Sequence, residues 1–162
     1  MQRRSTSLHV VSWWTVYTIV AVWLQTLLPG VDFLASGLVL SLQERPGPQT
    51  AFLAVLWVLL QEGMGTMAFG YGLMWFGVLA LAYLGGQWLF EARSFLFMCL
   101  LGIMLGIGHP LLAFFLGSLQ GVVLPLKELA LEGLFQTVLF PVVWYVARTL
   151  FPQGMRCDDS NV

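Results

Sequence analysis

The stretch QEGMGTMAFGYGLMWFGVLALAYL at residues 61–84 decides how this chain folds. It opens on the polar pair Gln61 and Glu62, passes through glycine-rich residues 63–72, and then becomes apolar again. A polar pair followed by glycines lets a chain leave a bilayer and re-enter it within a few residues. Backbone without helical hydrogen bonds is tolerated only near water or inside protein. The pattern therefore predicts a turn between two membrane helices.

The composition is typical of an integral membrane protein. Of 162 residues, 59% are hydrophobic and only 9% are charged, whereas soluble domains carry about 25% charged residues. The net charge of -1 provides no clustered basic face, so we exclude nucleic-acid binding. Cys99 and Cys157 have no spacing that indicates a disulfide or a metal site. We expect an all-α polytopic bundle in the lipid bilayer, without metal or cofactor.

Apolar runs predict about six transmembrane segments, at residues 8–28, 31–42, 50–60, 71–90, 95–123 and 133–150. The second and third are short. A helix of twelve residues reaches about 18 Å, less than the hydrocarbon thickness of about 30 Å. These two segments therefore cross by thinning the bilayer, lie buried in the bundle, or form one re-entrant hairpin. The first run is interpreted as a retained span, because no small-residue cleavage site follows it.

Two irregular features are expected in the second half of the chain. Pro110 lies inside the long fifth run, so we expect a kink near His109, whose side chain would bond a carbonyl freed by the proline. Residues 125–132, which include Lys127 and Glu132, are predicted to be a polar connection. Residues 1–151 would form one membrane domain, and residues 152–162 a polar cytoplasmic tail.

Basic residues predict the orientation. With six crossings, all but one of them lie on the same side, and Lys127 alone lies on the other. The larger set is Arg3, Arg4, Arg45, Arg93, Arg148 and Arg156. Lysine and arginine concentrate on the cytoplasmic side of membrane proteins. We therefore expect both termini in the cytoplasm and the turns near Asp32 and Glu62 on the outer face.

Four ionisable residues lie near membrane depth: Asp32, Glu62, His109 and Glu132. Such residues are candidates for function by default, although Asp32 and Glu62 are also well placed to cap short helices. One alternative is an intramembrane hydrolase with Glu62 as the base and His109 as its helper. The paired glutamates and arginine of intramembrane glutamate proteases are absent, so no catalytic residue is expected.

Small residues recur four positions apart, which lets helix backbones approach closely. The pairs are Gly102 and Gly106, Gly117 and Gly121, and Gly37 and Ser41. Such faces serve either internal packing or a partner's helix. We expect the face of Gly102 and Gly106 to belong to a partner-binding region, together with the outer turns.

Several motifs together resemble the MreD family of rod-shape-determining proteins. They are the first helix ending in Pro29 with Asp32 behind it, ERPGP at 44–48, QEGMGTMAFG at 61–70, AYLGGQWLFEAR at 82–93, and Pro141 after LFQTVLF. The likeness covers about residues 8–151. Glu62 departs from the family, which usually has Asp at this position.

The resemblance implies a six-span, multi-pass protein of the bacterial inner (cytoplasmic) membrane. It further implies a non-enzymatic scaffold of the elongation machinery, which builds peptidoglycan and sets cell shape. Its expected partners are an MreC-like bitopic membrane protein and the peptidoglycan-synthesising complex. The candidate partner-binding or pocket residues are Asp32, Glu62, Gly63, Gly65, Gly70, Gly102, Gly106 and His109.

An alternative is the substrate-binding component of an energy-coupling-factor vitamin transporter, which is similar in size and span number. In that interpretation Trp57, Tyr71, Trp75 and Trp88 would stack on a flat ligand beneath the glycine-rich turn. The first helix argues against it. That component docks through small residues on its first helix, where this chain has a single alanine, Ala21.

Overall fold

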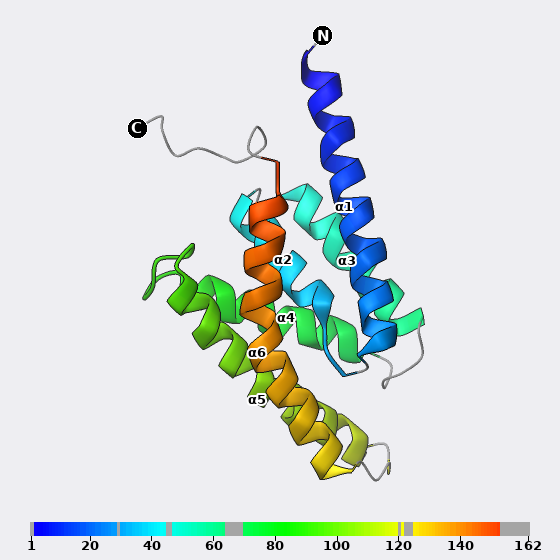
Figure 1. The fold of residues 1–162 in the computed structure, drawn as a ribbon. Helices are drawn as coiled ribbons and strands as arrows, with labels where there is room; N and C mark the ends of the chain where they lie inside the picture. The colour runs from blue at the N-terminus through cyan, green and yellow to red at the C-terminus, as the bar shows by residue number, and fades with distance from the viewer. Residues whose placement is uncertain are drawn as a thin grey trace.

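The computed structural model describes residues 2–28, 30–44, 47–63, 70–119, 121 and 125–152, with residues 2–8 described in their backbone only. Within these ranges the chain forms six α-helices and no strand, which confirms the all-α prediction (Figure 1). The helices are α1 (Gln2–Leu27), α2 (Phe33–Glu44), α3 (Pro48–Gly63), α4 (Tyr71–Gly86), α5 (Phe95–Leu119) and α6 (Leu126–Leu150).

The short helix α2 lies at the centre of the structure. It packs against α1, α3, α4 and α6, and its residues from Phe33 to Ser41 are all buried. A helix that is buried on every side needs no polar face, which fits its apolar sequence FLASGLVL at 33–40. Of the options that its length left open, burial within the bundle is the one observed for α2.

Among the described residues, three helices are long and apolar enough to cross a membrane: α1 from His9 to Leu27, α5 and α6. The apolar helices α2 and α4 are shorter. Most of the remaining large apolar side chains on the long helices are exposed, as lipid-facing side chains are. The architecture is that of a helical membrane bundle.

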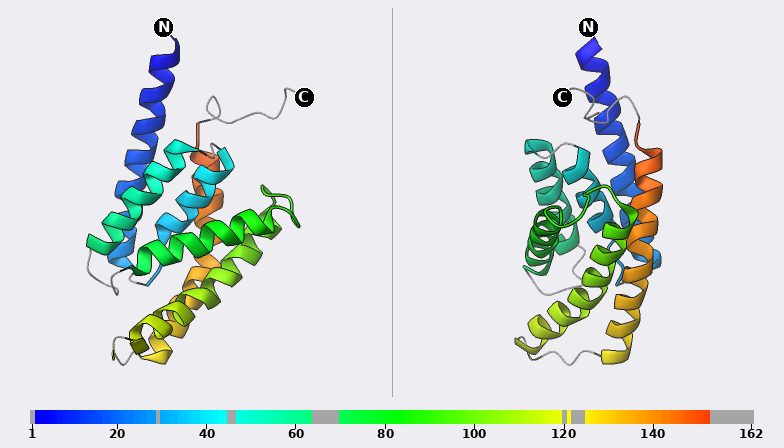
Figure 2. Two further views of the ribbon diagram at one scale, coloured as in Figure 1. Left: turned by 180° about the vertical axis from the view of Figure 1, so that it is seen from behind. Right: turned by 90° about the vertical axis from the view of Figure 1, so that its left-hand side faces the viewer.

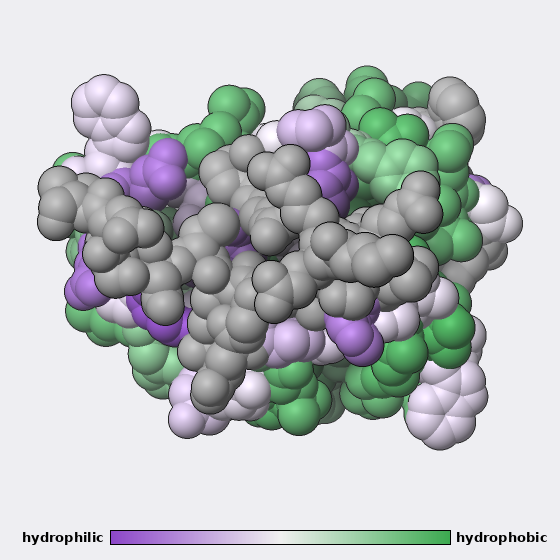
Figure 3. Space-filling model, turned by 90° about the horizontal axis from the view of Figure 1, so that it is seen from above, coloured by the Kyte–Doolittle hydropathy of each residue, from purple (hydrophilic) through white to green (hydrophobic). Residues whose placement is uncertain are grey.

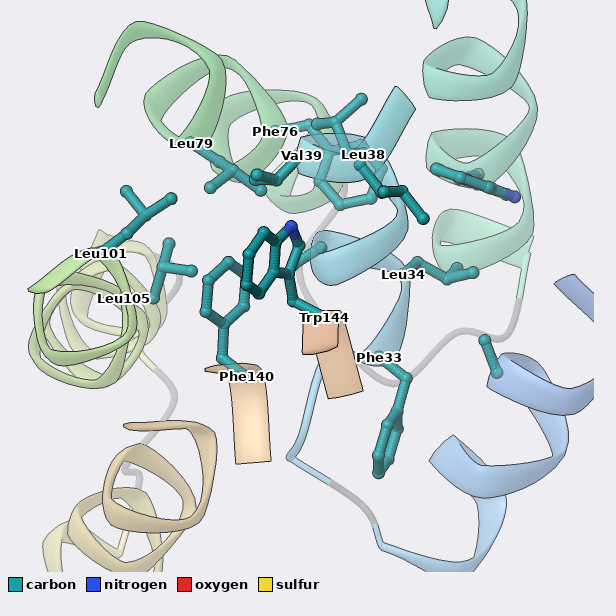
Figure 4. Packing of buried hydrophobic residues seen from close by; sticks show 14 of the residues in the cluster. Phe33, Leu34, Leu38, Val39, Phe76, Leu79, Leu101, Leu105, Phe140 and Trp144 are labelled. Atoms are coloured by element: carbon teal, nitrogen blue, oxygen red, sulfur yellow. The ribbon is translucent and has the colours of Figure 1, made fainter. Parts of the chain in front are cut away.

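The interior joins side chains from four helices (Figure 4). Phe140 and Trp144 of α6 point toward Leu105 of α5, Leu79 of α4 and Val39 of α2. All five side chains are almost completely buried. Aromatic side chains bury the largest areas, so Phe140 and Trp144 anchor α6 to the central helix.

The second half of the chain differs from the sequence prediction. α6 begins at Leu126, so Lys127 and Glu132 lie on a helix and not in a polar connection. Pro125 directly precedes the first turn, and its fixed φ suits the start of a helix. The carboxylate of Glu128 in that turn interacts favourably with the positive end of the helix dipole. Helix α4 also differs from the prediction, because it ends at Gly86, four residues before the predicted end at residue 90.

Helices α5 and α6 form a closely packed antiparallel pair (Figure 2). A Cβ added to Gly106 would collide with the Gly133 carbonyl and with Thr137, and one added to Gly102 would lie 3.0 Å from the Thr137 carbonyl. This corrects the expectation that Gly102 and Gly106 face a partner. α6 of the same chain occupies their face.

Helix α1 begins and α6 ends at the same end of the bundle (Figure 1). There Arg148 Nη1 donates a hydrogen bond to the Arg93 carbonyl at 2.8 Å, and its guanidinium lies 5.1 Å from the Trp144 ring centroid. Seen from this end, hydrophilic patches lie among hydrophobic side chains (Figure 3). The structure thus brings together two of the arginines that the sequence assigned to one side.

Replacing Gly106 with alanine should destabilise the protein by about 1–3 kcal/mol, because the new methyl group overpacks the contact with α6. The matched control is Gly77→Ala on α4, where an added Cβ meets no atom within 4 Å. Unfolding of both variants in detergent micelles measures the difference. Equal stability of the two variants would contradict the close contact of α5 with α6.

Candidate functional site: a buried carboxylate that joins five helices

Asp32 lies between α1 and α2 and is only 6% exposed. Its Oδ1 accepts hydrogen bonds from the backbone N–H groups of Leu34 at 2.9 Å and Ala35 at 3.2 Å. These are the second and third residues of α2, so the carboxylate caps the helix in the usual N-cap geometry. The capping role that the sequence allowed for Asp32 is therefore observed.

The same carboxylate also contacts helices far from α2. Gln25 Nε2 of α1 donates to Oδ1 at 3.1 Å, and Trp75 Nε1 of α4 donates to Oδ2 at 2.9 Å. Gln61 of α3 adds a side-chain hydrogen bond. Each of these contacts presents an N–H to the carboxylate, which accepts throughout, as an ionised carboxylate does.

Gln136 of α6 completes the cluster through the backbone of Asp32. Its Oε1 accepts the Asp32 N–H at 2.8 Å, and its Nε2 donates to the Asp32 carbonyl at 3.3 Å. Gln136 is fully buried. We name Gln25, Asp32, Gln61, Trp75 and Gln136 the Asp32 cluster. Through it α1, α2, α3, α4 and α6 meet at one point.

Two opposing effects act on the Asp32 carboxyl. Burial disfavours its charged form, because a charge is costly away from water, and the hydrogen bonds from Gln61, Trp75, Ala35 and Leu34 favour that form. Burial is the larger effect. The donors lower the free-energy cost of burying the charge in the bundle, but they do not abolish that cost.

His109 of α5 reaches the edge of this cluster through aromatic contacts. Its ring lies edge-on to Trp75 at 5.4 Å and to Tyr71 at 5.7 Å between centroids. His109 is 3% exposed, and its Nδ1 has no hydrogen-bond partner. The expected bond to a carbonyl freed by Pro110 is therefore not made by Nδ1.

Glu62 caps the following helix. Its Oε2 accepts the Gly70 N–H and its Oε1 accepts the Gly72 N–H, both at 3.0 Å. Gly70 has a φ of 85°, in the left-handed region that favours glycine. A carboxylate at the N-terminus of α4 also interacts favourably with the helix dipole. Gly63 ends α3, and Gly65 lies outside the described residues.

Glu132 lies on the first half of α6, beside the turn that follows α1. Its side chain packs directly against Gly30, where an added Cβ would collide with it. Gly30 has a φ of 89°, so glycine is favoured there for its conformation as well as for space. Glu132 also lies within electrostatic range of the Tyr71 hydroxyl.

The four aromatic residues proposed to stack on a flat ligand do not form one wall. Trp57 packs with Trp14 and Tyr17, and its Nε1 donates to Thr18 Oγ1 at 2.9 Å. Tyr71 and Trp75 pack with His109 instead. Trp88 is 89% exposed in the turn after α4.

Among the described residues, no group of three or more His, Cys, Asp or Glu side chains is placed to hold a metal ion. Comparison of the chain with protein-family models, with curated proteins and with solved structures gives no match.

Trp75→Phe should destabilise the protein by about 1–3 kcal/mol, because it leaves Asp32 Oδ2 without its indole donor inside the bundle. Trp88→Phe is the control, since Trp88 is exposed and makes no such bond. Denaturant unfolding in micelles, followed by far-UV circular dichroism, compares the two. A larger loss for Trp88→Phe would contradict the assigned role of the indole.

Proposed function

We propose that this chain is a non-enzymatic membrane scaffold of the bacterial elongation machinery, as its likeness to MreD implies. The observation that carries the proposal is the Asp32 cluster. The carboxylates of Asp32 and Glu62 both accept N–H groups that start helices. Acidic groups used in this way support rigid placement of the outer turns, which is what a scaffold needs.

The partners proposed are an MreC-like bitopic membrane protein and the peptidoglycan-synthesising complex. A bitopic protein presents one apolar helix, and such helices dock by close packing against exposed helix faces. The hairpin of α5 and α6 offers an apolar surface made of Ile107, Leu111, Phe114, Phe115, Leu131, Leu134, Phe135 and Val138, which all stay exposed. This surface replaces the face of Gly102 and Gly106 as the proposed partner-binding site on these helices.

The proposed location is the bacterial inner membrane with six crossings and both termini in the cytoplasm. Contact between Arg148 and the Arg93 carbonyl supports a single charged end. The vitamin-transporter alternative is favoured less, because Trp57 and Trp75, which were proposed to stack on a ligand, make hydrogen bonds within the protein.

Affinity purification of the tagged protein from mildly solubilised membranes tests the proposal. A photoreactive residue at Phe115 or Leu134 should crosslink to a bitopic membrane protein. The same residue at Phe52 on α3, also exposed, is the control and should crosslink more weakly. Recovery of cell-wall synthesis proteins supports the scaffold.

Recovery of a vitamin-like molecule with an ATPase-linked membrane subunit would overturn this proposal in favour of the transporter component. Equal crosslinking from Phe115 and Phe52 would overturn the choice of the α5 and α6 surface.

A further inference from the structure

Four buried polar atoms around the Asp32 cluster have no hydrogen-bond partner. They are Gln25 Oε1, Gln61 Oε1, Tyr71 Oη and His109 Nδ1. Tyr71 is 6% exposed, and His109 is as deeply buried. Buried polar groups are nearly always paired, so an unpaired group in a native structure indicates a missing water, ion or ligand. The four atoms come from four helices, α1, α3, α4 and α5.

Contacts through Asp32 and Trp75 link the four residues that carry these atoms. Gln25 and Gln61 each bond the Asp32 carboxylate through their amide groups, which leaves their carbonyl oxygens free. Trp75 bonds the same carboxylate and contacts the His109 ring, and Tyr71 also contacts that ring. The hydroxyl of Tyr71 is within electrostatic range of Asp32.

The unpaired atoms specify the chemistry of the occupant. An amide oxygen only accepts hydrogen bonds, while a hydroxyl oxygen and a neutral imidazole nitrogen accept them as well. Gln25 and Gln61 therefore require an occupant that supplies N–H or O–H donors, and Tyr71 and His109 can accept from the same donors. Among the described residues no basic side chain pairs with Asp32, whose cluster therefore contains a carboxylate without a counter-charge. Glu132 adds a second carboxylate nearby.

We propose that Gln25 Oε1, Gln61 Oε1, Tyr71 Oη and His109 Nδ1 bind a primary ammonium group. Such a group carries three N–H donors, which the four acceptors would share, and one positive charge, which would balance the carboxylate of Asp32. It is comparable in size to a water molecule, so it suits a site built from single atoms. The described residues offer no metal-ligand set that would favour a metal ion instead.

Two sources supply this chemistry. One is a small soluble amine. The other is the ethanolamine headgroup of a phospholipid, since the cluster forms where α1 ends and where α2 and α4 begin. The inference goes beyond the scaffold proposal, because it holds or fails whichever protein partner is found.

Tyr71→Phe is the informative variant, because it removes one proposed ligand while breaking no hydrogen bond within the protein. Tyr145→Phe on α6, where the side chain is exposed, is the matched control. The thermal midpoint of each protein is measured in detergent with methylammonium chloride, tetramethylammonium chloride or sodium chloride at equal concentration.

Methylammonium should raise the midpoint of the unmodified protein and of Tyr145→Phe by about 2–4 °C with saturation. The rise should shrink by at least half in Tyr71→Phe. Tetramethylammonium, which has no N–H donor, and sodium should give no such rise. A response that is equal for all three salts, unaltered in Tyr71→Phe, or absent in both this arm and the lipid arm overturns the proposal.

The lipid arm uses nanodiscs of phosphatidylethanolamine or phosphatidylcholine, whose headgroups differ in their N–H donors. A higher midpoint in phosphatidylethanolamine that is lost in Tyr71→Phe assigns the site to the headgroup. Stabilisation by methylammonium alone assigns it to a soluble amine. These thermal midpoints do not depend on which protein partner is found. A result that contradicts the scaffold proposal would therefore leave the ammonium proposal untouched, and the reverse also holds.

Discussion

A carboxylate buried in a membrane protein must be surrounded by hydrogen-bond donors, and this structure is arranged around that requirement at Asp32. Unpaired charges are costly away from water. Here the donors come from the start of α2 and from Gln25, Gln61 and Trp75, while Gln136 pairs with the backbone of Asp32. Because each donor belongs to a different helix, satisfying the charge also fixes how those helices meet.

The central position of α2 follows from the same constraint. A helix of twelve residues is too short to cross a bilayer alone, but it is stable when other helices cover it on every side. Asp32 caps its first turn, and at its other end Ser41 and Thr50 form a buried hydrogen bond at 2.8 Å to α3. The long helices then carry the lipid-facing surface, with α5 and α6 held together at Gly106 and Gly133. Polar contacts therefore determine how the helices are arranged around α2, and apolar side chains pack the space between them.

The sequence predicted the helices and the capping positions because these depend on local patterns. Apolar run lengths revealed the helices, Asp32 stood just before a short helix, and Glu62 stood at the end of another, before the turn that leads to α4. Contacts between distant residues were not predictable, since Asp32 and Gln136 are separated by 104 positions. A glutamine within an apolar span was a usable signal, because polar residues in membrane helices turn inward to pair. The start of α6 was missed because Lys127 and Glu128 suggested a loop, whereas a helix extending past the bilayer carries charges equally well.

The proposed scaffold role, the exposed hairpin surface and the ammonium site all presuppose that Asp32 couples its helices. A double-mutant cycle between Asp32→Asn and Trp75→Phe, measured by unfolding in micelles, tests this coupling most directly. Residues that share a buried hydrogen bond show interaction energies of about 0.5–3 kcal/mol. We predict a coupling in that range, with the double variant less destabilised than the sum of the single variants. Additive effects would contradict the central place given to the carboxylate.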